Sequence, residues 1–106
     1  MATELLLVFS TCPDPETAQR IGYTLVCEKL AACANILPQV RSIYRWKGNI
    51  EDSAEVLVFF KTTADVYARF EQRLNELHPY EVPEIVAVPV TRGLEAYLGW
   101  VAESCA

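Results

Sequence analysis

The 106-residue chain has the length of one domain, residues 1–106, with a hydrophobic fraction of 52% and a net charge of −5. No basic tract exceeds two residues, which argues against nucleic-acid binding, since that needs clustered Lys and Arg. The N-terminal apolar run is short and has no basic region before it, so we expect neither a signal peptide nor a membrane span. We therefore predict a cytoplasmic protein whose four cysteines, which show no CxxC spacing, are free thiols.

The first third of the chain predicts a buried strand followed by a helix. A continuous apolar run within residues 4–12 is typical of a central strand. Asp14 is a helix-capping residue and Pro15 suits the first helical position, so the apolar residues that follow at helical spacing predict a helix over 15–31.

A long β-hairpin is predicted between residues 33 and 62. The run 40–46 alternates, with Tyr44 and Trp46 on one side, and extends over roughly 20 Å. The run 54–60 is nearly all apolar, and Lys47-Gly48-Asn49 between the two runs favours a tight turn. Pro38 lacks an N–H group and is expected at a bulge or a sheet edge. A hairpin with large aromatic residues near its tip indicates a partner.

The second half of the chain predicts a second helix, a stiff loop, a fourth strand and a last short helix. Thr62 and Asp65 have capping-box spacing ahead of a helix expected over 64–77, which Pro79 ends. The loop 78–84 contains two prolines. The strand 85–90 carries Pro89 near its end, which indicates an edge or a termination.

The order β-α-β-β-α-β-α is that of an α+β, ferredoxin-like sandwich with a C-terminal helix. Helices would cover one face of a four-stranded antiparallel sheet. The other face would be bare in a monomer, and an exposed apolar face usually marks an interface, so we expect a homo-oligomer.

Four blocks of the sequence, in order and spanning nearly the whole chain, resemble the signature blocks of the CutA divalent-cation tolerance family: residues 30–36, 42–48, 61–63 and 78–85. The resemblance implies a tight homotrimer with inter-subunit sheet pairing through the hairpin, an architecture similar to the trimeric PII signalling proteins. It also implies an association with tolerance of copper and other divalent cations, a cytoplasmic location in bacteria, and no established catalytic reaction.

Candidate metal ligands follow from donor chemistry, because soft or borderline divalent ions prefer thiolate and imidazole whereas hard ions prefer carboxylates. The candidates are His78, Cys33, Glu81 and Glu84, with Cys12 as a further thiol. One subunit offers few ligands, so a site would straddle subunits.

This chain departs from the family pattern in its metal-binding positions. Copper attribution in the family relies on a Cys at the end of strand one and on paired histidines. At the matching positions this chain has Ser10 and Leu77-His78. We therefore expect copper (Cu²⁺) binding to be weak and centred on His78.

A second set of residues could form a small-ligand cleft, if the hairpin of one subunit meets the loop of the next: Tyr44, Trp46, Glu55, Lys61, Tyr80 and Glu84. Lys61, Tyr80 and Tyr44 are its candidate ligand-contacting residues. Ordinary interface packing is the alternative explanation for this cluster. A PII-like regulatory trimer that binds a small ligand or a protein partner is thus the alternative function, and a scaffold role is a third.

Catalysis is not expected, because no Ser-His-Asp or Cys-His arrangement and no Gly-rich phosphate loop is present. The remaining cysteines have structural explanations. Cys33 is either a buried core residue or a soft, redox-sensitive thiol lining a cleft, while Cys27 is assigned to the core and Cys105 to the tail.

Overall fold

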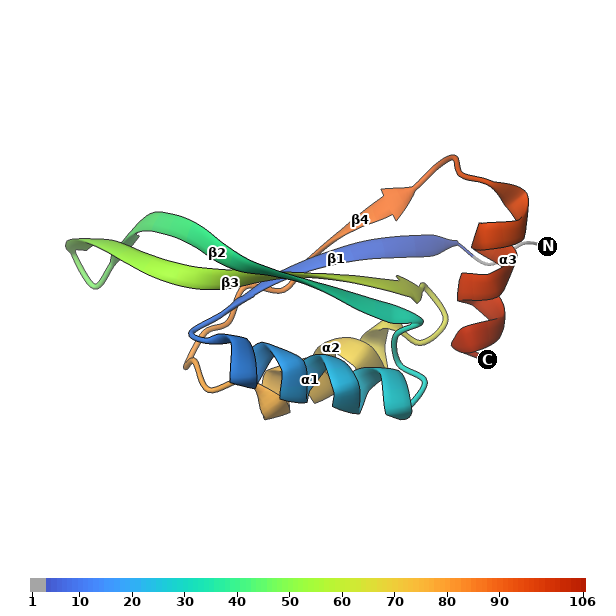
Figure 1. Ribbon diagram of the computed structural model, residues 1–106, viewed down its shortest axis with the longest axis horizontal. Coiled ribbons are helices and arrows are strands. Elements are labelled where there is room, and N and C mark those ends of the chain that lie inside the picture. The colour runs from blue at the N-terminus through green and yellow to red at the C-terminus, as the bar shows by residue number, and fades with distance from the viewer. Residues whose placement is uncertain (1–3) are drawn as a thin grey trace.

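The computed structural model describes residues 4–106 and contains four strands and three helices (Figure 1). In chain order they are β1 (Leu5–Cys12), α1 (Pro15–Cys27), β2 (Cys33–Trp46), β3 (Asn49–Thr63), α2 (Tyr67–Leu77), β4 (Val86–Val90) and α3 (Glu95–Ser104). The strands form one antiparallel sheet in the order β2-β3-β1-β4. The predicted ferredoxin-like arrangement and its long hairpin are confirmed.

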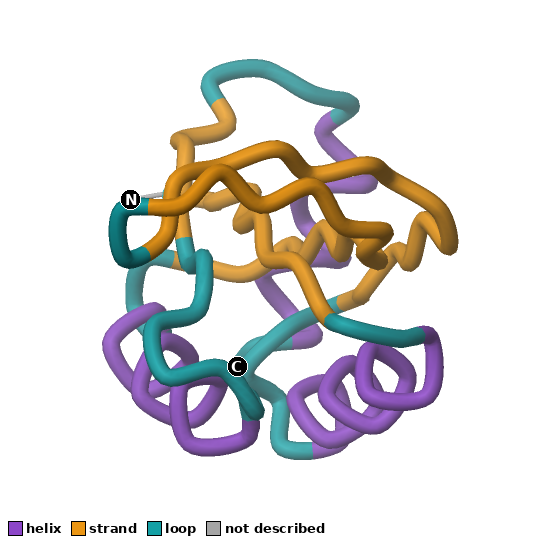
Figure 2. The backbone as a smooth tube through the Cα atoms, turned by 90° about the vertical axis from the view of Figure 1, so that its left-hand side faces the viewer, coloured by secondary structure: helices purple, strands orange, loops and turns teal. Residues whose placement is uncertain are grey.

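One face of the sheet is covered by α1 and α2, which lie together on the same side (Figures 1 and 2). Alternate side chains of β1 and β3 point into this layer because strand side chains repeat every two residues. Phe60 of β3 packs edge-on against Phe70 of α2 with ring centroids 5.2 Å apart, and Ile21 and Leu25 of α1 are completely buried beside the sheet. This is the hydrophobic core.

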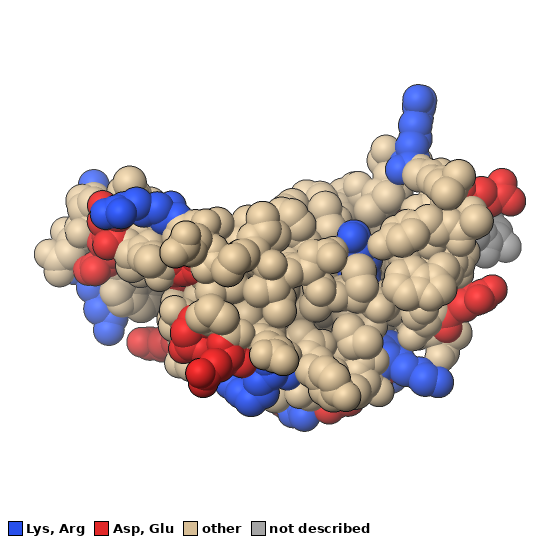
Figure 3. All heavy atoms as spheres, viewed as in Figure 1, with Lys and Arg blue, Asp and Glu red and all other residues tan. Residues whose placement is uncertain are grey.

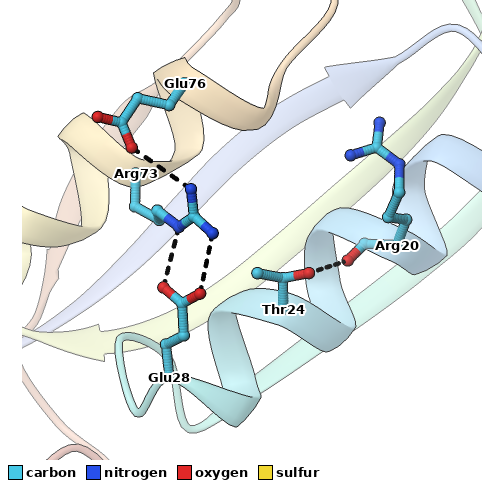
Figure 4. A network of polar contacts seen from close by, with 5 residues as sticks. All are labelled: Arg20, Thr24, Glu28, Arg73 and Glu76. Atoms are coloured by element: carbon cyan, nitrogen blue, oxygen red, sulfur yellow. Dashed lines mark hydrogen bonds and ion pairs between the residues drawn. The ribbon is translucent and has the colours of Figure 1, made fainter.

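An arginine joins the two helices at the outer surface of this layer (Figure 4). Arg73 of α2 donates through Nε and Nη2 to both carboxylate oxygens of Glu28, at 2.9 and 3.0 Å, and its Nη1 lies 3.5 Å from Glu76. Arg73 holds the pKa of Glu28 below its usual value. Solvent screens this exposed pair, so it adds little stability.

The hairpin follows the sequence signals closely. Trp46 pairs with Asn49, and the two residues between them, Lys47 and Gly48, have φ values of 50° and 83°. Positive φ at both central positions is the type I′ geometry that matches the strand twist. The register shifts after Leu37, so the predicted bulge at Pro38 is present on an edge strand. Pro89 likewise lies in the edge strand β4.

The first helix ends at Cys27, not at residue 31 as predicted. Lys29 adopts a left-handed conformation with φ of 61°, its N–H bonds to the carbonyl of Val26 at 3.1 Å, and the N–H of Leu30 bonds to the carbonyl of Leu25 at 3.0 Å. This pair of bonds is the Schellman motif that terminates helices, with a lysine in the position usually held by glycine.

The capping box predicted for the second helix is wrong. Thr62 belongs to β3, where its buried hydroxyl donates to the carbonyl of Leu30 at 2.6 Å. The helix begins only at Tyr67, after Val66, and no side chain caps it. The Thr62 hydroxyl thus forms a tertiary hydrogen bond and not the helix cap that the local pattern predicted.

The four cysteines are unpaired, as predicted, but two lie in unexpected places. Cys27 is exposed at the end of α1, whereas Cys105 is buried and lies 3.9 Å from the Thr62 hydroxyl. The assignments to core and tail are therefore reversed. Within residues 4–106, no helix is both long and apolar enough to cross a membrane.

The sheet face opposite α1 and α2 is largely uncovered, and we call its apolar part the open face: Leu7, Phe9, Leu57, Phe59, Val86 and Val88. Phe9 and Phe59 pack edge to face there, with centroids 5.1 Å apart. The concave surface along the top of Figure 3 is mostly uncharged, while charged side chains gather at the hairpin end and along the helical side. The bare face predicted from the element order is present.

Candidate functional site

A buried cysteine and a buried histidine meet at the end of the sheet. Cys12 is the last residue of β1 and His78 directly follows α2, so the fold joins two ends that lie far apart in sequence. The Sγ of Cys12 is 3.9 Å from Nε2 of His78, and both residues are buried. This Cys12–His78 pair is the place where a thiol and an imidazole lie together.

Both nitrogens of the His78 ring already have hydrogen-bond partners. The backbone N–H of Tyr80 donates to Nδ1 at 3.1 Å, so Nδ1 is an acceptor and carries no proton. The other nitrogen, Nε2, lies 2.7 Å from the carbonyl oxygen of Thr11 and must be the donor, because a carbonyl only accepts. The ring is thus held in one neutral tautomer.

Burial also keeps both members of this pair uncharged at neutral pH. It raises the pKa of the Cys12 thiol to about 11, with additional repulsion from Asp14 and Glu55. It lowers the pKa of His78, opposed by the hydrogen bond to Thr11. At pH 7 the pair is a neutral thiol beside a neutral imidazole, so a metal ion that uses both as ligands must displace the thiol proton and shift the imidazole proton from Nε2 to Nδ1.

An open cleft of about 630 Å³ lies beside this pair, between the hairpin and the loop 79–84. Its walls include Tyr44, Trp46, Glu55, Tyr80 and Glu84. These residues were expected to converge if the hairpin of one subunit met the loop of the next, and a single chain already brings them together.

The cleft contains a buried carboxylate. Glu55 is 7% exposed, and its Oε2 accepts a 2.5 Å hydrogen bond from the hydroxyl of Tyr80. Burial, and then that bond, raise the pKa of Tyr80 above its usual value. The second oxygen, Oε1, accepts no hydrogen bond from any residue between 4 and 106, and Glu55 forms no ion pair within that range.

Two of the predicted site residues lie elsewhere. Lys61 is absent from the cleft lining; its Nζ donates to Asn35 at 2.8 Å and lies 5.8 Å from the ring centroid of Tyr97. The half-buried thiol of Cys33 belongs to the same neighbourhood, 3.9 Å from the Tyr97 hydroxyl. Cys33 is half-buried, so its prediction as a core residue is wrong, and it does not line this cleft.

The predicted metal ligands do not form one cluster. Glu81 and Glu84 line the cleft, whereas His78 pairs with Cys12 and Cys33 lies near Tyr97. Among residues 4–106, no group of three or more His, Cys, Asp or Glu side chains is placed to hold a metal ion. The sequence offered Cys12 only as a further thiol; its place at the end of a strand was the signal for its pairing with His78.

Ser10, where the family pattern has a cysteine, is fully buried in the core face of β1. Its hydroxyl oxygen has no hydrogen-bond partner in the described part of the chain. It contributes no ligand beside Cys12 and His78.

Similarity to known proteins identifies the family. The model of the CutA1 divalent ion tolerance protein family matches residues 6–104. The chain belongs to the CutA1 family. CutA proteins are non-catalytic divalent-cation tolerance proteins, in agreement with the absence of a predicted catalytic motif.

Relatives of known name are similar over most of this chain. The divalent-cation tolerance protein CutA of Thermus thermophilus is 45% identical over 98 residues, which are 92% of this chain and 95% of that protein. Protein CutA of Mus musculus is 44% identical over 88% of this chain, which spans only 52% of the mouse protein.

Solved CutA structures share the fold. The Thermus thermophilus protein superposes with a TM-score of 0.93 at 43% identity, covering 96% of this chain and 99% of that one. CutA1 from the psychrotrophic bacterium Shewanella sp. SIB1 gives a TM-score of 0.92 at 44% identity, covering 98% and 97%.

Proposed function

We propose that this CutA1 protein takes part in divalent-cation tolerance through weak, exchangeable metal binding at the Cys12–His78 pair. The observation that supports this is the 3.9 Å separation of Sγ and Nε2, which is shorter than the sum of one zinc–sulfur and one zinc–nitrogen bond, about 4.3 Å, so that one ion is able to reach both atoms with a bent S–metal–N angle. A thiolate and an imidazole suit a soft or borderline ion such as copper or zinc.

The same contacts argue that the affinity is low. A metal ion on Nε2 replaces the hydrogen bond from that atom to Thr11, and a metal ion on Sγ requires a thiolate whose pKa burial has raised to about 11. Two protein ligands leave the coordination shell to be completed by water or by another chain. Binding therefore releases the thiol proton and should strengthen as the pH rises.

Titration calorimetry with Zn²⁺ and with Cu²⁺, at pH 6.5 and pH 8.0, tests this proposal. Weak binding should be stronger at pH 8.0 and should disappear in both Cys12→Ser and His78→Gln. The matched control is Cys27→Ser, which removes an exposed thiol far from the pair and should leave the metal isotherm unchanged. Identical isotherms for wild type and His78→Gln would overturn the assignment.

We further propose that the chain assembles as a homotrimer through the open face and the hairpin. Apolar residues remain accessible there, including Val86 at 51%, Ile43 at 68% and Ile50 at 61%. Exposure of this extent across one sheet face and the adjoining arm is typical of a surface that another protein covers. The threefold symmetry rests on the family resemblance.

Light scattering after size exclusion tests the assembly. The wild type should elute at three times the chain mass, and Phe59→Glu, which places a charge in the open face, should dissociate it. Tyr23→Glu introduces the same charge on an exposed helix position and should remain assembled. A monomeric wild type at micromolar concentration would contradict the proposal.

A cytoplasmic location is also proposed, supported by four free thiols, which persist in reducing compartments. The family occurs in more than one compartment: a relative from Arabidopsis thaliana is named chloroplastic and one from Archaeoglobus fulgidus is described as periplasmic. Cell fractionation followed by immunoblotting distinguishes these locations, and recovery from the periplasm would refute this proposal.

A further inference from the structure

One backbone hydrogen bond connects the loop 79–84 to the metal site proposed above. The N–H of Tyr80 donates to Nδ1 of His78 at 3.1 Å, and the two rings lie close together, with centroids 4.7 Å apart. His78 itself is held at the end of α2, where its own N–H bonds to the carbonyl of Leu74 at 3.0 Å. The position of the loop therefore depends on which nitrogen of the His78 ring carries the proton.

The direction of this hydrogen bond is opposite to the one usually found beside a metal-binding histidine. A histidine that coordinates a metal through one nitrogen normally donates its other ring N–H to an acceptor, such as a carbonyl or a carboxylate. In this chain the partner of Nδ1 is the N–H of Tyr80, which is itself a donor. The contacts thus favour the tautomer with the proton on Nε2, the nitrogen that lies 3.9 Å from Cys12.

The arrangement cannot persist when Nε2 serves as a ligand. The proton that Nε2 loses is then balanced by one that Nδ1 gains, and the ring stays neutral. Nδ1–H and the N–H of Tyr80 are two donors, and neither is able to accept from the other at a separation of 3.1 Å. The Tyr80 N–H must therefore move away from Nδ1.

The same loop also contacts the hairpin. The hydroxyl of Tyr80 donates to Glu55 of β3, and Oε2 of Glu81 lies 3.9 Å from Nζ of Lys47 at the hairpin turn. A displacement of the backbone at Tyr80 therefore changes the contacts between the loop and both ends of β3.

We propose that the loop 79–84 is a metal-responsive switch, in which use of His78 Nε2 as a ligand places the ring proton on Nδ1 and releases Tyr80 from His78. This inference rests on the proposed function and adds regulation to it. The change takes place within one subunit, whether or not a second subunit covers the hairpin. By linkage, the loop in its bound position opposes metal binding by the same factor by which binding releases the loop.

Nitrogen-15 NMR of the wild-type protein, with and without Zn²⁺, tests the switch. Because the sequence has one histidine, labelled histidine gives two ring-nitrogen signals, and both belong to His78. Without zinc, Nε2 should have the chemical shift of a protonated nitrogen and Nδ1 that of an unprotonated one. At saturating zinc the proton should be found on Nδ1.

Hydrogen exchange in uniformly labelled protein gives a second, independent measurement. The Tyr80 amide should exchange at least about tenfold faster at saturating zinc, because it has lost its acceptor. The His78 amide is the internal control. Its bond to Leu74 is not affected by the ring proton, so its exchange should stay within about twofold.

Two variants show whether the effect depends on the Cys12–His78 pair. Cys12→Ser should lose zinc binding and keep slow exchange of the Tyr80 amide with or without zinc. His78→Phe has a ring without nitrogens, so the Tyr80 amide should exchange quickly in both conditions. The wild-type measurements need neither variant, so the test stands if one of them does not fold.

The outcomes separate this proposal from the metal site itself. Zinc binding that requires Cys12 but leaves the proton on Nε2, or leaves the exchange of the Tyr80 amide unchanged, would overturn the switch and not the metal site. Absence of zinc binding in the calorimetry described above would overturn both.

Discussion

Replacing Tyr80 by Phe removes one hydroxyl group and should destabilise this CutA1 protein strongly for so small a change. The hydroxyl donates a 2.5 Å hydrogen bond to Glu55, a residue that is only 7% exposed. Hydrogen bonds to charged groups contribute about 1.5–3 kcal/mol, and leaving a buried charge without its donor lies at the upper end of that range. We therefore expect a loss of about 2–3 kcal/mol, or a fall in Tm of roughly 10 °C or more for a domain of this size.

Urea denaturation at one fixed protein concentration measures this loss, since the proposed assembly would make stability depend on concentration. Tyr67→Phe is the matched control, because its hydroxyl also donates to a carboxylate, that of Glu71 at 2.9 Å, but Glu71 is exposed and water replaces the bond. Its effect should stay below about 0.5 kcal/mol. Adding Glu55→Gln to Tyr80→Phe should restore part of the loss, since a neutral amide is less costly to bury than a charge.

The account of Glu55 as a buried charge fails if Tyr80→Phe and Tyr67→Phe destabilise the protein equally. It also fails if the double variant is less stable than Tyr80→Phe alone.

Three further predictions concern single side chains. Asp14 caps α1, and its hydrogen bonds at the helix start hold its pKa below the ordinary value of 3.8, so its charged form stabilises the fold above that pH. The amount by which Asp14→Ala lowers the Tm should therefore become smaller between pH 6 and pH 3. An equal lowering at both pH values would contradict this. Exposed Cys27 should react quickly with iodoacetamide at pH 7.5, whereas buried Cys12 should react only after denaturation, as measured by mass spectrometry. Rapid labelling of Cys12 in the folded protein would disprove its burial. Thr62→Val should lower the free energy of unfolding by about 1–2 kcal/mol, measured by urea denaturation, because it removes the buried donor to the Leu30 carbonyl. An unchanged midpoint would show that this carbonyl has another partner.

Local chemistry was sufficient to predict the fold where a single residue constrains the backbone. Gly48 after Lys47 predicted the tight turn, and the missing N–H groups of Pro38 and Pro89 predicted a bulge and an edge strand. These signals act within a few residues, so tertiary structure did not override them.

The prediction failed where a side chain had a choice of partners. The Thr62 hydroxyl bonds across the fold to Leu30 and not to its own helix start, and Lys29 accepts a left-handed conformation that sequence would assign to glycine. The site shows the same limit. The pairing of Cys12 with His78 depends on where β1 and α2 end in space, which spacing along the chain does not reveal.

The hairpin described above also affects how the protein folds. The molecule measures 47 Å along its longest axis against 25 and 23 Å along the others, and the outer residues Ile43 and Ile50 remain mostly exposed. A two-stranded ribbon of this kind is marginally stable on its own. If the chain assembles as proposed, hydrogen exchange at the backbone amides of the hairpin should therefore slow only in the assembled state, while the core exchanges slowly in either state. The body of the subunit then folds as a unimolecular reaction, and ordering of the arm becomes a slower step whose rate depends on protein concentration.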